Sequence, residues 1–354
     1  MEQYGRSYTQ PKGRITGFDF LRGLAILLTL CRHSTLESTN ILKQIGWVGV
    51  HIFFVLSSFL ILNILLQEFY LTGKINYYRF FIRRALKIYP LYYLFILILV
   101  YKNRDIFLSS IDYRIQVLSQ IFHIQNYTGI IWYHTWSLAA EEHFYIGMSI
   151  ILSIYLFFSK TKNFHKLAFL FLLVIVIVPF LRFGSTQLYK TEWFLNTHFI
   201  MDSFAFGALL ALCKFVSSNI FLFLIKLKHY LLIPIFLLLI PLFLLPPGDR
   251  FMNSIGFTMN YLAATLMIVY VLSIEYFFRS KNIFSFITIQ PLASIGIASY
   301  SIYLFHKPIK TIIYNFEMRE SFKLTLYFLT SILAGKLIWY LIERPIASYK
   351  STLR

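Results

Sequence analysis

Charge and cysteine are both scarce in this chain. Only 14% of its 354 residues are charged, whereas 58% are hydrophobic. A soluble domain of this size could not bury so much apolar surface, so the composition excludes an ordinary soluble fold. The two cysteines, Cys31 and Cys213, both lie in apolar stretches, which excludes a disulfide framework and the usual zinc spacing.

Acidic residues are few as well. The chain has 15 Asp and Glu and 33 Lys and Arg, which gives a net charge of +18. No separate basic soluble domain is present, so we expect no nucleic-acid partner. The sequence also lacks a Gly-x-Ser-x-Gly nucleophile motif and a phosphate-binding glycine loop, which removes the common soluble hydrolases and nucleotide-binding folds.

Repeated apolar runs of about 20 residues predict an all-α integral membrane protein. The excess of Lys and Arg in alternate segments favours cytoplasmic N- and C-termini. We expect a cytoplasmic tail at 1–14, one transmembrane domain at 15–345 and a cytoplasmic tail at 346–354. No cleavable signal pattern precedes Ile15, so the first span is expected to stay uncleaved. About ten spans are predicted, near 15–35, 46–67, 88–101, 139–158, 167–183, 198–213, 229–246, 256–278, 292–314 and 322–342.

The first predicted span carries ionisable residues at membrane depth. Asp19, Arg22 and His33 interrupt the apolar run from Ile15 to Ser34. At about 100° and 1.5 Å per residue, Arg22 and His33 share one helix face roughly 16 Å apart. Such residues are costly in lipid and usually face a protein interior, so we expect a polar cavity beside this helix.

A basic segment, YYRFFIRRALKIYP, covers residues 77–90. We expect a loop that precedes the third span, in which Arg83, Arg84 and Lys87 line one turn of helix ahead of Pro90. These residues would either anchor the protein to anionic lipid headgroups or bind the phosphates of a cytosolic nucleotide-bearing donor.

Two further segments combine polar and aromatic residues. The first, WSLAAEEHFY at 136–145, contains Glu141, whose carboxylate could orient a histidine or act as a general base. The second, IASYSIYLFHKPI at 297–309, carries Tyr303 and His306 on one helix face. The alternative for the first segment is an interfacial helix start with acids near its N-terminus. The alternative for the second is interhelical hydrogen bonds and an interfacial aromatic belt. His134 with Glu141 or His143 matches no common metal spacing, so we predict no metal site.

The chain resembles the acyltransferase-3 family of integral membrane O-acyltransferases. The matching segments occur in the family's order across nearly the whole chain: GFDFLRGLAILLTLCRHS, GVHIFFVLSSFLI, RRALKIYP, WSLAAEEHFY, SYSIYLFH and IERP. The resemblance implies a ten-span enzyme that moves an acyl group, often acetyl, from cytosolic acyl-CoA to a sugar hydroxyl.

The resemblance also implies roles for individual residues. His33 falls on the essential histidine and Arg22 on its paired arginine, while Arg84 and Lys87 fall on two basic donor-site residues. Glu141 falls on the glutamate after Trp-Ser-Leu. The chain departs from the family where Lys87 replaces an arginine and where His51, a possible second base, replaces a common aspartate. His51 makes Asp19 the expected charge partner of Arg22.

The resulting mechanistic hypothesis uses acyl-CoA as a donor substrate and no permanently bound cofactor. His33 would deprotonate the acceptor or carry the acyl group, and Glu141 or Asp19 would tune His33. The basic residues that would hold the donor are Arg83, Arg84, Lys87 and Arg22.

The substrate side of the hypothesis uses the aromatic and polar segments. Tyr303 or Ser301 would stabilise the oxyanion that forms on the thioester carbonyl. The residues that we assign to the substrate side are Tyr303, Ser301, His306 and Trp136.

The acceptor is expected to be a surface polysaccharide, a lipopolysaccharide or a lipid-linked sugar at the bacterial inner membrane. Membrane lipids would be further partners. Outer loops are expected at 102–135 and 184–197. Their aromatic residues would either stack on a sugar ring or mark the membrane interface: Tyr127, Trp132, Tyr133 and Trp193. The alternatives are a secondary transporter or flippase, which would not consume acyl-CoA, and a hydrolase that passes the acyl group to water.

Overall fold

The computed structural model describes residues 14–37, 40–159, 164–188, 195–245, 249–280 and 282–352. Within these ranges the chain forms helices and connecting turns, with no strand. Most of the expected N-terminal tail, the last two residues of the C-terminal tail and Trp193 lie outside them. Two compact units divide the chain, and each is described by itself.

Unit 1 contains the chain up to Arg32, Glu37–Lys74 and Phe144–Ile297. Its helices are α1 (Thr16–His33, whose last residue belongs to unit 2), α2 (Ile41–Ile45), α3 (Trp47–Thr72), α8 from Phe144 on (Trp136–Phe158), α9 (His165–Leu188), η3 (Thr197–Ile200), α10 (Met201–Val216), α11 (Ser218–Lys226), α12 (Leu232–Leu244), η4 (Met252–Gly256), α13 (Phe257–Ser273), α14 (Glu275–Phe278), η5 (Ser285–Ile289) and α15 (Gln290–Ile297).

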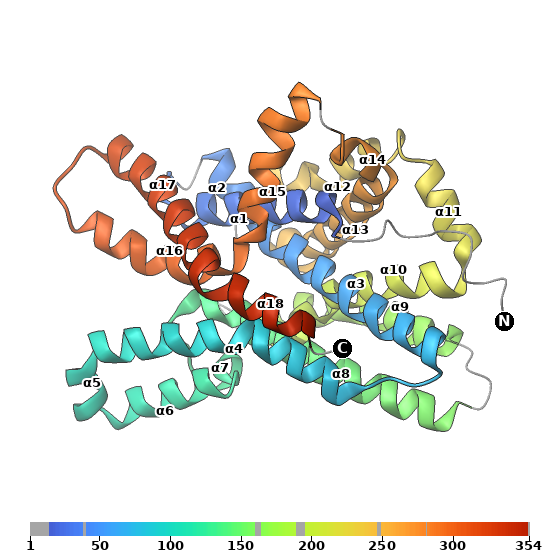
Figure 1. Cartoon of the computed structure of the whole chain (residues 1–354), viewed down its shortest axis with the longest axis horizontal. Helices are drawn as coiled ribbons and strands as arrows, with labels where there is room; N and C mark the ends of the chain where they lie inside the picture. The colour runs from blue at the N-terminus through green and yellow to red at the C-terminus, as the bar shows by residue number, and fades with distance from the viewer. Residues whose placement is uncertain are drawn as a thin grey trace. The chain divides into compact units, whose positions relative to one another are not determined.

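The centre of unit 1 is α3, which packs against α10 and α13 (Figure 1). Small residues let the helices of this unit approach closely, as is common where helices associate within a membrane. A Cβ on Gly207 of α10 would collide with the carbonyl oxygen of Val55 on α3. A Cβ on Gly296 of α15 would collide with the carbonyl oxygen of Asp19 on α1. Any larger residue at either position would push two helices apart.

Unit 2 contains His33–Leu36, Ile75–His143 and the chain from Ala298 on. Its helices are α4 (Tyr77–Lys102), α5 (Arg104–Ser109), α6 (Ile111–Ile121), α7 (Gln125–Thr128), η1 (Tyr133–Thr135), the first two turns of α8, α16 (Ser299–Tyr314), α17 (Glu320–Ile338), η6 (Trp339–Glu343) and α18 (Arg344–Thr352).

The basic segment at 77–90 is helical throughout. The expected turn of helix at Arg83, Arg84 and Lys87 is confirmed, whereas the loop expected before it is wrong. α4 begins at Tyr77 because the side chain of Asn76 caps it by accepting a hydrogen bond from the backbone N–H of Arg79. Pro90 lies inside this helix instead of starting it. The cap at Asn76 was the signal that marked the true start.

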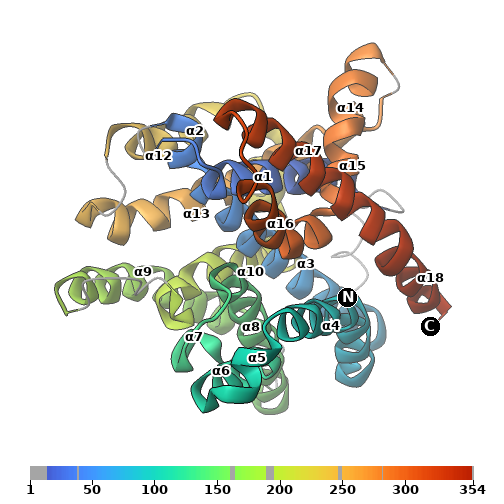
Figure 2. The same ribbon diagram turned by 90° about the vertical axis from the view of Figure 1, so that its left-hand side faces the viewer.

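The core of unit 2 forms where α4 meets α6 and α16. Tyr92 and Phe95 are completely buried and cluster with Val117 and Leu304. The hydroxyl of Tyr92 also donates to the carbonyl oxygen of Gln120, which ties α4 to the end of α6. Figure 2 shows α5, α6 and α7 grouped beside α4. The expected outer loop at 102–135 is therefore largely helical.

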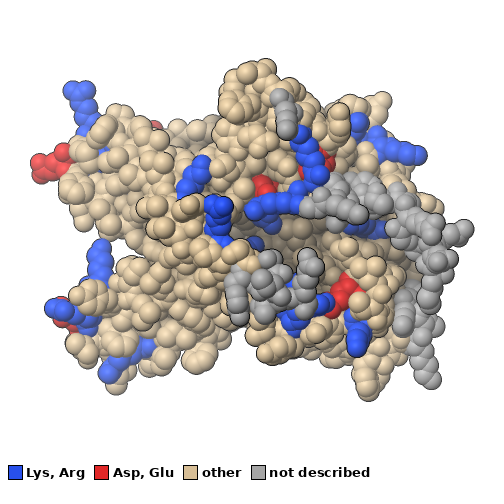
Figure 3. Space-filling view, viewed as in Figure 1, with Lys and Arg blue, Asp and Glu red and all other residues tan. Residues whose placement is uncertain are grey.

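Six helices in the described ranges are long and apolar enough to cross a membrane, or seven if α15 and α16 form one broken span. A helix occupies each of the ten predicted positions. The six are Ile41–Thr72, Tyr77–Lys102, His165–Ser185, Thr197–Val216, Met252–Ser273 and Glu320–Ser348. The face drawn in Figure 3 carries few Lys, Arg, Asp or Glu side chains among broad uncharged areas. The membrane class is supported, with six to seven spans by length and composition.

Candidate functional site

Two histidines from distant parts of the sequence meet in unit 2. Nδ1 of His33, the last residue of α1, lies 2.8 Å from Nε2 of His306 on α16. Their rings stack with centroids 4.9 Å apart. His306 is completely buried and His33 is half-buried. Nζ of Lys310 donates to the backbone carbonyl of His33 at 2.7 Å, so α16 also holds the end of α1.

A second layer of polar groups surrounds His306. The hydroxyl of Tyr303 donates to the carbonyl oxygen of His134 and also bonds the hydroxyl of Ser137. Nε2 of His134 lies 3.0 Å from the carbonyl oxygen of Leu304. Burial lowers the pKa of His134 to about 3, because it outweighs the bond to Leu304, which favours the charged form, and acts together with the nearby charge of Lys307. His134 is therefore neutral near neutral pH and donates this bond.

The two expected oxyanion donors already donate their hydroxyl protons within the protein. The proton of Tyr303 goes to the carbonyl of His134. The hydroxyl of Ser301 donates to the carboxylate of Glu343 in η6. A hydroxyl has one proton to donate, so either residue would have to exchange its partner before binding an oxyanion.

The basic residues of α4 lie next to carboxylates. Arg84 is 3.9 Å from Glu141 at the start of α8, and both side chains are 17% exposed. The neighbouring Glu142 accepts a hydrogen bond of 3.1 Å from Tyr89. Arg83 is half-buried and Lys87 is exposed. Glu141 thus lies beside Arg84. Its expected role in orienting His33 or acting as a general base remains a prediction.

Trp136, assigned to the substrate side, is the first residue of α8. It is buried, and its backbone carbonyl accepts a bond of 3.0 Å from the side-chain amide of Asn126. This bond ties the first residue of α8 to Asn126. The structure thus positions the backbone of Trp136, and its role toward a substrate remains a prediction.

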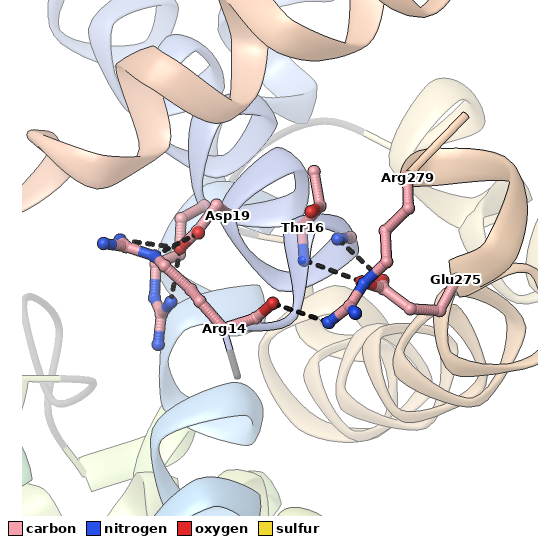
Figure 4. A network of polar contacts seen from close by, with 7 residues as sticks. Arg14, Thr16, Asp19, Glu275 and Arg279 are labelled. Atoms are coloured by element: carbon pink, nitrogen blue, oxygen red, sulfur yellow. Dashed lines mark hydrogen bonds and ion pairs between the residues drawn. The ribbon is translucent and has the colours of Figure 1, made fainter. Parts of the chain in front are cut away.

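Asp19 belongs to a polar network at the start of α1 in unit 1 (Figure 4), and Arg22 is bonded to it. Nη1 of Arg22 donates to Asp19 at 3.0 Å, and Arg14 binds the same carboxylate. Asp19 is buried, and both arginines keep some exposure. The structure therefore pairs Arg22 with Asp19.

Glu275 of α14 closes the other half of this network. Its carboxylate accepts hydrogen bonds of 2.9 and 3.0 Å from the backbone N–H groups of Thr16 and Gly17. Arg279 donates to Glu275 at 2.9 Å and to the carbonyl of Arg14 (Figure 4). A carboxylate at this position satisfies two backbone donors and the positive end of the helix dipole.

The sequence reasoning missed a buried ion pair in unit 1. Arg182 of α9 and Asp202 of α10 are both 0% exposed, with Nη2 and Oδ2 2.7 Å apart. The distribution of Lys and Arg predicts that Arg182 lies in an outer segment. The acidic Asp202 in the first turn of α10 was the signal from which its partner could have been recognised. His51, expected as a possible second base, packs between Phe257 and Tyr261 with ring centroids 4.9 and 4.7 Å away.

The described residues contain no group of three His, Cys, Asp or Glu side chains that could hold a metal ion. Sequence reasoning also missed the layer formed by His134 and Ser137. Both lie close to Trp136, so the signal lay beside the motif. Their importance depends on contacts with α16, which sequence spacing does not reveal.

Comparisons with known proteins concern the chain as a whole. A family model described as an acyltransferase domain matches residues 15–344. O-acetyltransferase OatA of Staphylococcus aureus (strain NCTC 8325 / PS 47) is 26% identical over 360 residues, covering 94% of this chain and 57% of that relative. The protein of the same name from strain COL gives the same values. The chain thus spans little more than half the length of these curated relatives. No solved structure matches it.

Proposed function

The chain belongs to the acyltransferase-3 family, and from this premise we propose that it is a membrane O-acyltransferase. It transfers an acyl group, acetyl by the names of its relatives, from cytosolic acyl-CoA to a sugar hydroxyl. The acceptor belongs to a surface polysaccharide, a lipopolysaccharide or a lipid-linked sugar. The observation that carries this proposal is the hydrogen-bonded pair of His33 and His306 inside a helical membrane protein.

His33 acts as the general base in this proposal. It takes the proton of the acceptor hydroxyl while the oxygen attacks the thioester carbonyl carbon. The new C–O bond forms, the C–S bond breaks, and the proton returns from the imidazolium to the sulfur of CoA. Acyl transfer to His33 itself, followed by transfer to the acceptor, has the same overall balance.

The donor phosphates bind at the beginning of α4. Arg83, Arg84 and Lys87 place three positive charges within two turns of this helix, and unit 2 contains both these residues and His33. Arginine pairs well with phosphate because its planar guanidinium offers paired N–H donors. A phosphate reaching Arg84 competes with Glu141, whose 3.9 Å contact is long for an ion pair. The donor role of Arg22 stays a prediction, and the structure pairs its guanidinium with Asp19.

The topology in this proposal is ten spans with both termini in the cytoplasm of a bacterial cell, the protein lying in its inner membrane. The ten helical positions and the distribution of Lys and Arg support it. Tagging the termini with a reporter that is active only in the cytoplasm tests this arrangement. Inactive reporters at both ends would contradict it.

Labelled acetyl-CoA tests the activity directly. Membrane vesicles containing the protein receive acetyl-CoA labelled in the acetyl group together with cell-envelope glycan fractions. We expect label in an alkali-labile ester on the glycan and release of free CoA in equal amount. Free labelled acetate without ester would identify a hydrolase, and movement of a lipid-linked sugar without CoA release would identify a flippase.

Replacing the basic residues tests the donor site. Arg84→Ala combined with Lys87→Ala should raise the KM for acyl-CoA at least about tenfold, because charge-assisted hydrogen bonds contribute about 1.5–3 kcal/mol each. The apparent KM for the acceptor should change little. Lys228→Ala, which removes a cation outside this segment, is the matched control. An unchanged KM for acyl-CoA would remove the donor role.

A further inference from the structure

The side chain of His306 has both ring nitrogens in hydrogen bonds. Nδ1 lies 2.6 Å from the backbone carbonyl oxygen of Tyr303, one turn earlier on α16. Nε2 lies 2.8 Å from Nδ1 of His33. The ring is completely buried, and these two bonds occupy both of its nitrogens. His33, Tyr303 and His306 all belong to unit 2.

The protons on this chain of three groups follow from their chemistry. A carbonyl oxygen only accepts, so Nδ1 of His306 must carry a proton and donate it to Tyr303. A neutral imidazole carries one N–H, so Nε2 of His306 must then accept. The proton between the rings therefore belongs to Nδ1 of His33. In a neutral His33, this assignment places the basic lone pair on Nε2.

The other protonation state would put a charge on His306. A doubly protonated His306 would donate at both nitrogens and force His33 into the opposite tautomer. That state places a cation in a completely buried ring, near the ammonium of Lys310 that holds the backbone of His33. Burying a charge without a counterion is strongly unfavourable. The neutral arrangement is therefore the favoured one.

We propose that His306 is the positioning residue for His33: it holds the His33 ring in place and in the tautomer whose Nε2 is basic. The proposal rests on the proposed acyl transfer, in which this atom removes the acceptor proton. It assigns to a neutral histidine the orienting task that carboxylates often perform. Two carboxylates were considered for this task. Asp19 binds Arg14 and Arg22, and Glu141 lies 3.9 Å from Arg84.

The tautomer of His33 is the first test, and it needs no activity. The full-length protein, labelled with ¹⁵N in histidine and held in nanodiscs, is examined by NMR, with His33 assigned from a His33→Gln spectrum. We expect protonated Nδ1 and unprotonated Nε2 on His33 near neutral pH. A proton mainly on Nε2 would overturn the proposal, even if acyl transfer proceeds normally.

Substitutions at His306 provide the kinetic test. His306→Leu should lower kcat about 10²-fold, within the usual range for general acid–base catalysis, and leave the KM for acyl-CoA within about twofold. His306→Gln supplies one donor and one acceptor, as histidine does, and should recover at least about tenfold of that loss. His198→Leu, at an exposed histidine of unit 1, is the control.

The outcomes separate this proposal from the proposed function. Equal kcat for wild type and His306→Leu, or no recovery with His306→Gln despite the expected His33 tautomer, would overturn the role of His306. Absence of acyl transfer from the wild-type protein with every acceptor would contradict the proposed function instead. If His306→Leu fails to fold, the wild-type tautomer and His306→Gln still decide.

Discussion

Two buried polar clusters, one in each unit, use their hydrogen bonds differently. In unit 1, all three guanidinium nitrogens of Arg182 donate to oxygens, which belong to Asp202, Ser254, Phe199 and Thr258. In unit 2, hydrogen bonds join His33 through His306 to a carbonyl oxygen, and the tautomers that we propose give them a single direction. The bonds of the first arrangement leave no guanidinium nitrogen of Arg182 without an acceptor. Those of the second leave Nε2 of His33 as a basic nitrogen. We infer that the first cluster serves structure and the second serves chemistry.

Charge separates the two clusters as well. The ion pair of Arg182 and Asp202 needs each charge to compensate the other, because both are completely buried. The histidine pair is neutral and carries a smaller desolvation penalty. Mutations of Arg182 or Asp202 should therefore change mainly stability, and mutations of His33 or His306 should change mainly catalysis.

The largest predicted effect on stability is at the ion pair of Arg182 and Asp202. Arg182→Leu should lower the free energy of unfolding by about 3–5 kcal/mol, because it leaves Asp202 buried and unpaired. Thermal unfolding in detergent measures the change. Little change in the unfolding midpoint would show that the pair is not structural.

The double variant Arg182→Met with Asp202→Leu sharpens the same prediction. It replaces both charges by apolar groups and should recover most of the lost stability, since apolar replacements of buried pairs are often nearly neutral. Acyl transfer should recover with it. A stable double variant without activity would show that the Arg182–Asp202 pair takes part in catalysis, which contradicts its assignment to structure alone.

A smaller effect is expected at Tyr303. Tyr303→Phe removes a hydroxyl whose proton goes to the carbonyl of His134, so kcat should fall less than about tenfold, as expected for one neutral hydrogen bond. An oxyanion donor would instead cost about 10²–10³-fold. Initial rates at saturating acyl-CoA distinguish the two. A loss in the larger range would restore the oxyanion role.

The smallest effect is expected at the start of α1. Glu275→Gln keeps a hydrogen-bond acceptor but removes the charge that caps Thr16 and Gly17, and should cost about 1 kcal/mol of stability. Thermal unfolding measures this change, with Glu317→Gln as a control on another acid. A loss of acyl transfer at unchanged stability would assign Glu275 to the reaction.

Local pattern predicted the helical class and the positions of the helices well, because apolar runs report helices directly. It failed where a single residue type has more than one structural meaning. Pro90 predicts a helix start, whereas the structure begins α4 at Tyr77, where Asn76 caps the helix, and places Pro90 inside it. A side-chain cap is a local signal, so Asn76 could have been recognised from the sequence.

The sequence singled out the two histidines at the centre of the candidate site but not their pairing. His33 and His306 were both singled out, yet they are 273 residues apart in sequence, and no helical spacing could join them. Arg182 and Asp202 are 20 residues apart on successive helices, so their pairing also required the fold. Motifs identify polar residues in apolar spans, and the structure identifies their partners.

The rate of acyl transfer by His33→Ala tests the central claim most directly. Wild type and variant are compared in vesicles that contain equal amounts of folded protein, with saturating labelled acetyl-CoA and acceptor. We expect the kcat of His33→Ala to be about 10³-fold lower than that of the wild type, within the range for a general base, at a nearly unchanged unfolding midpoint. Full retention of the wild-type rate would contradict the central claim.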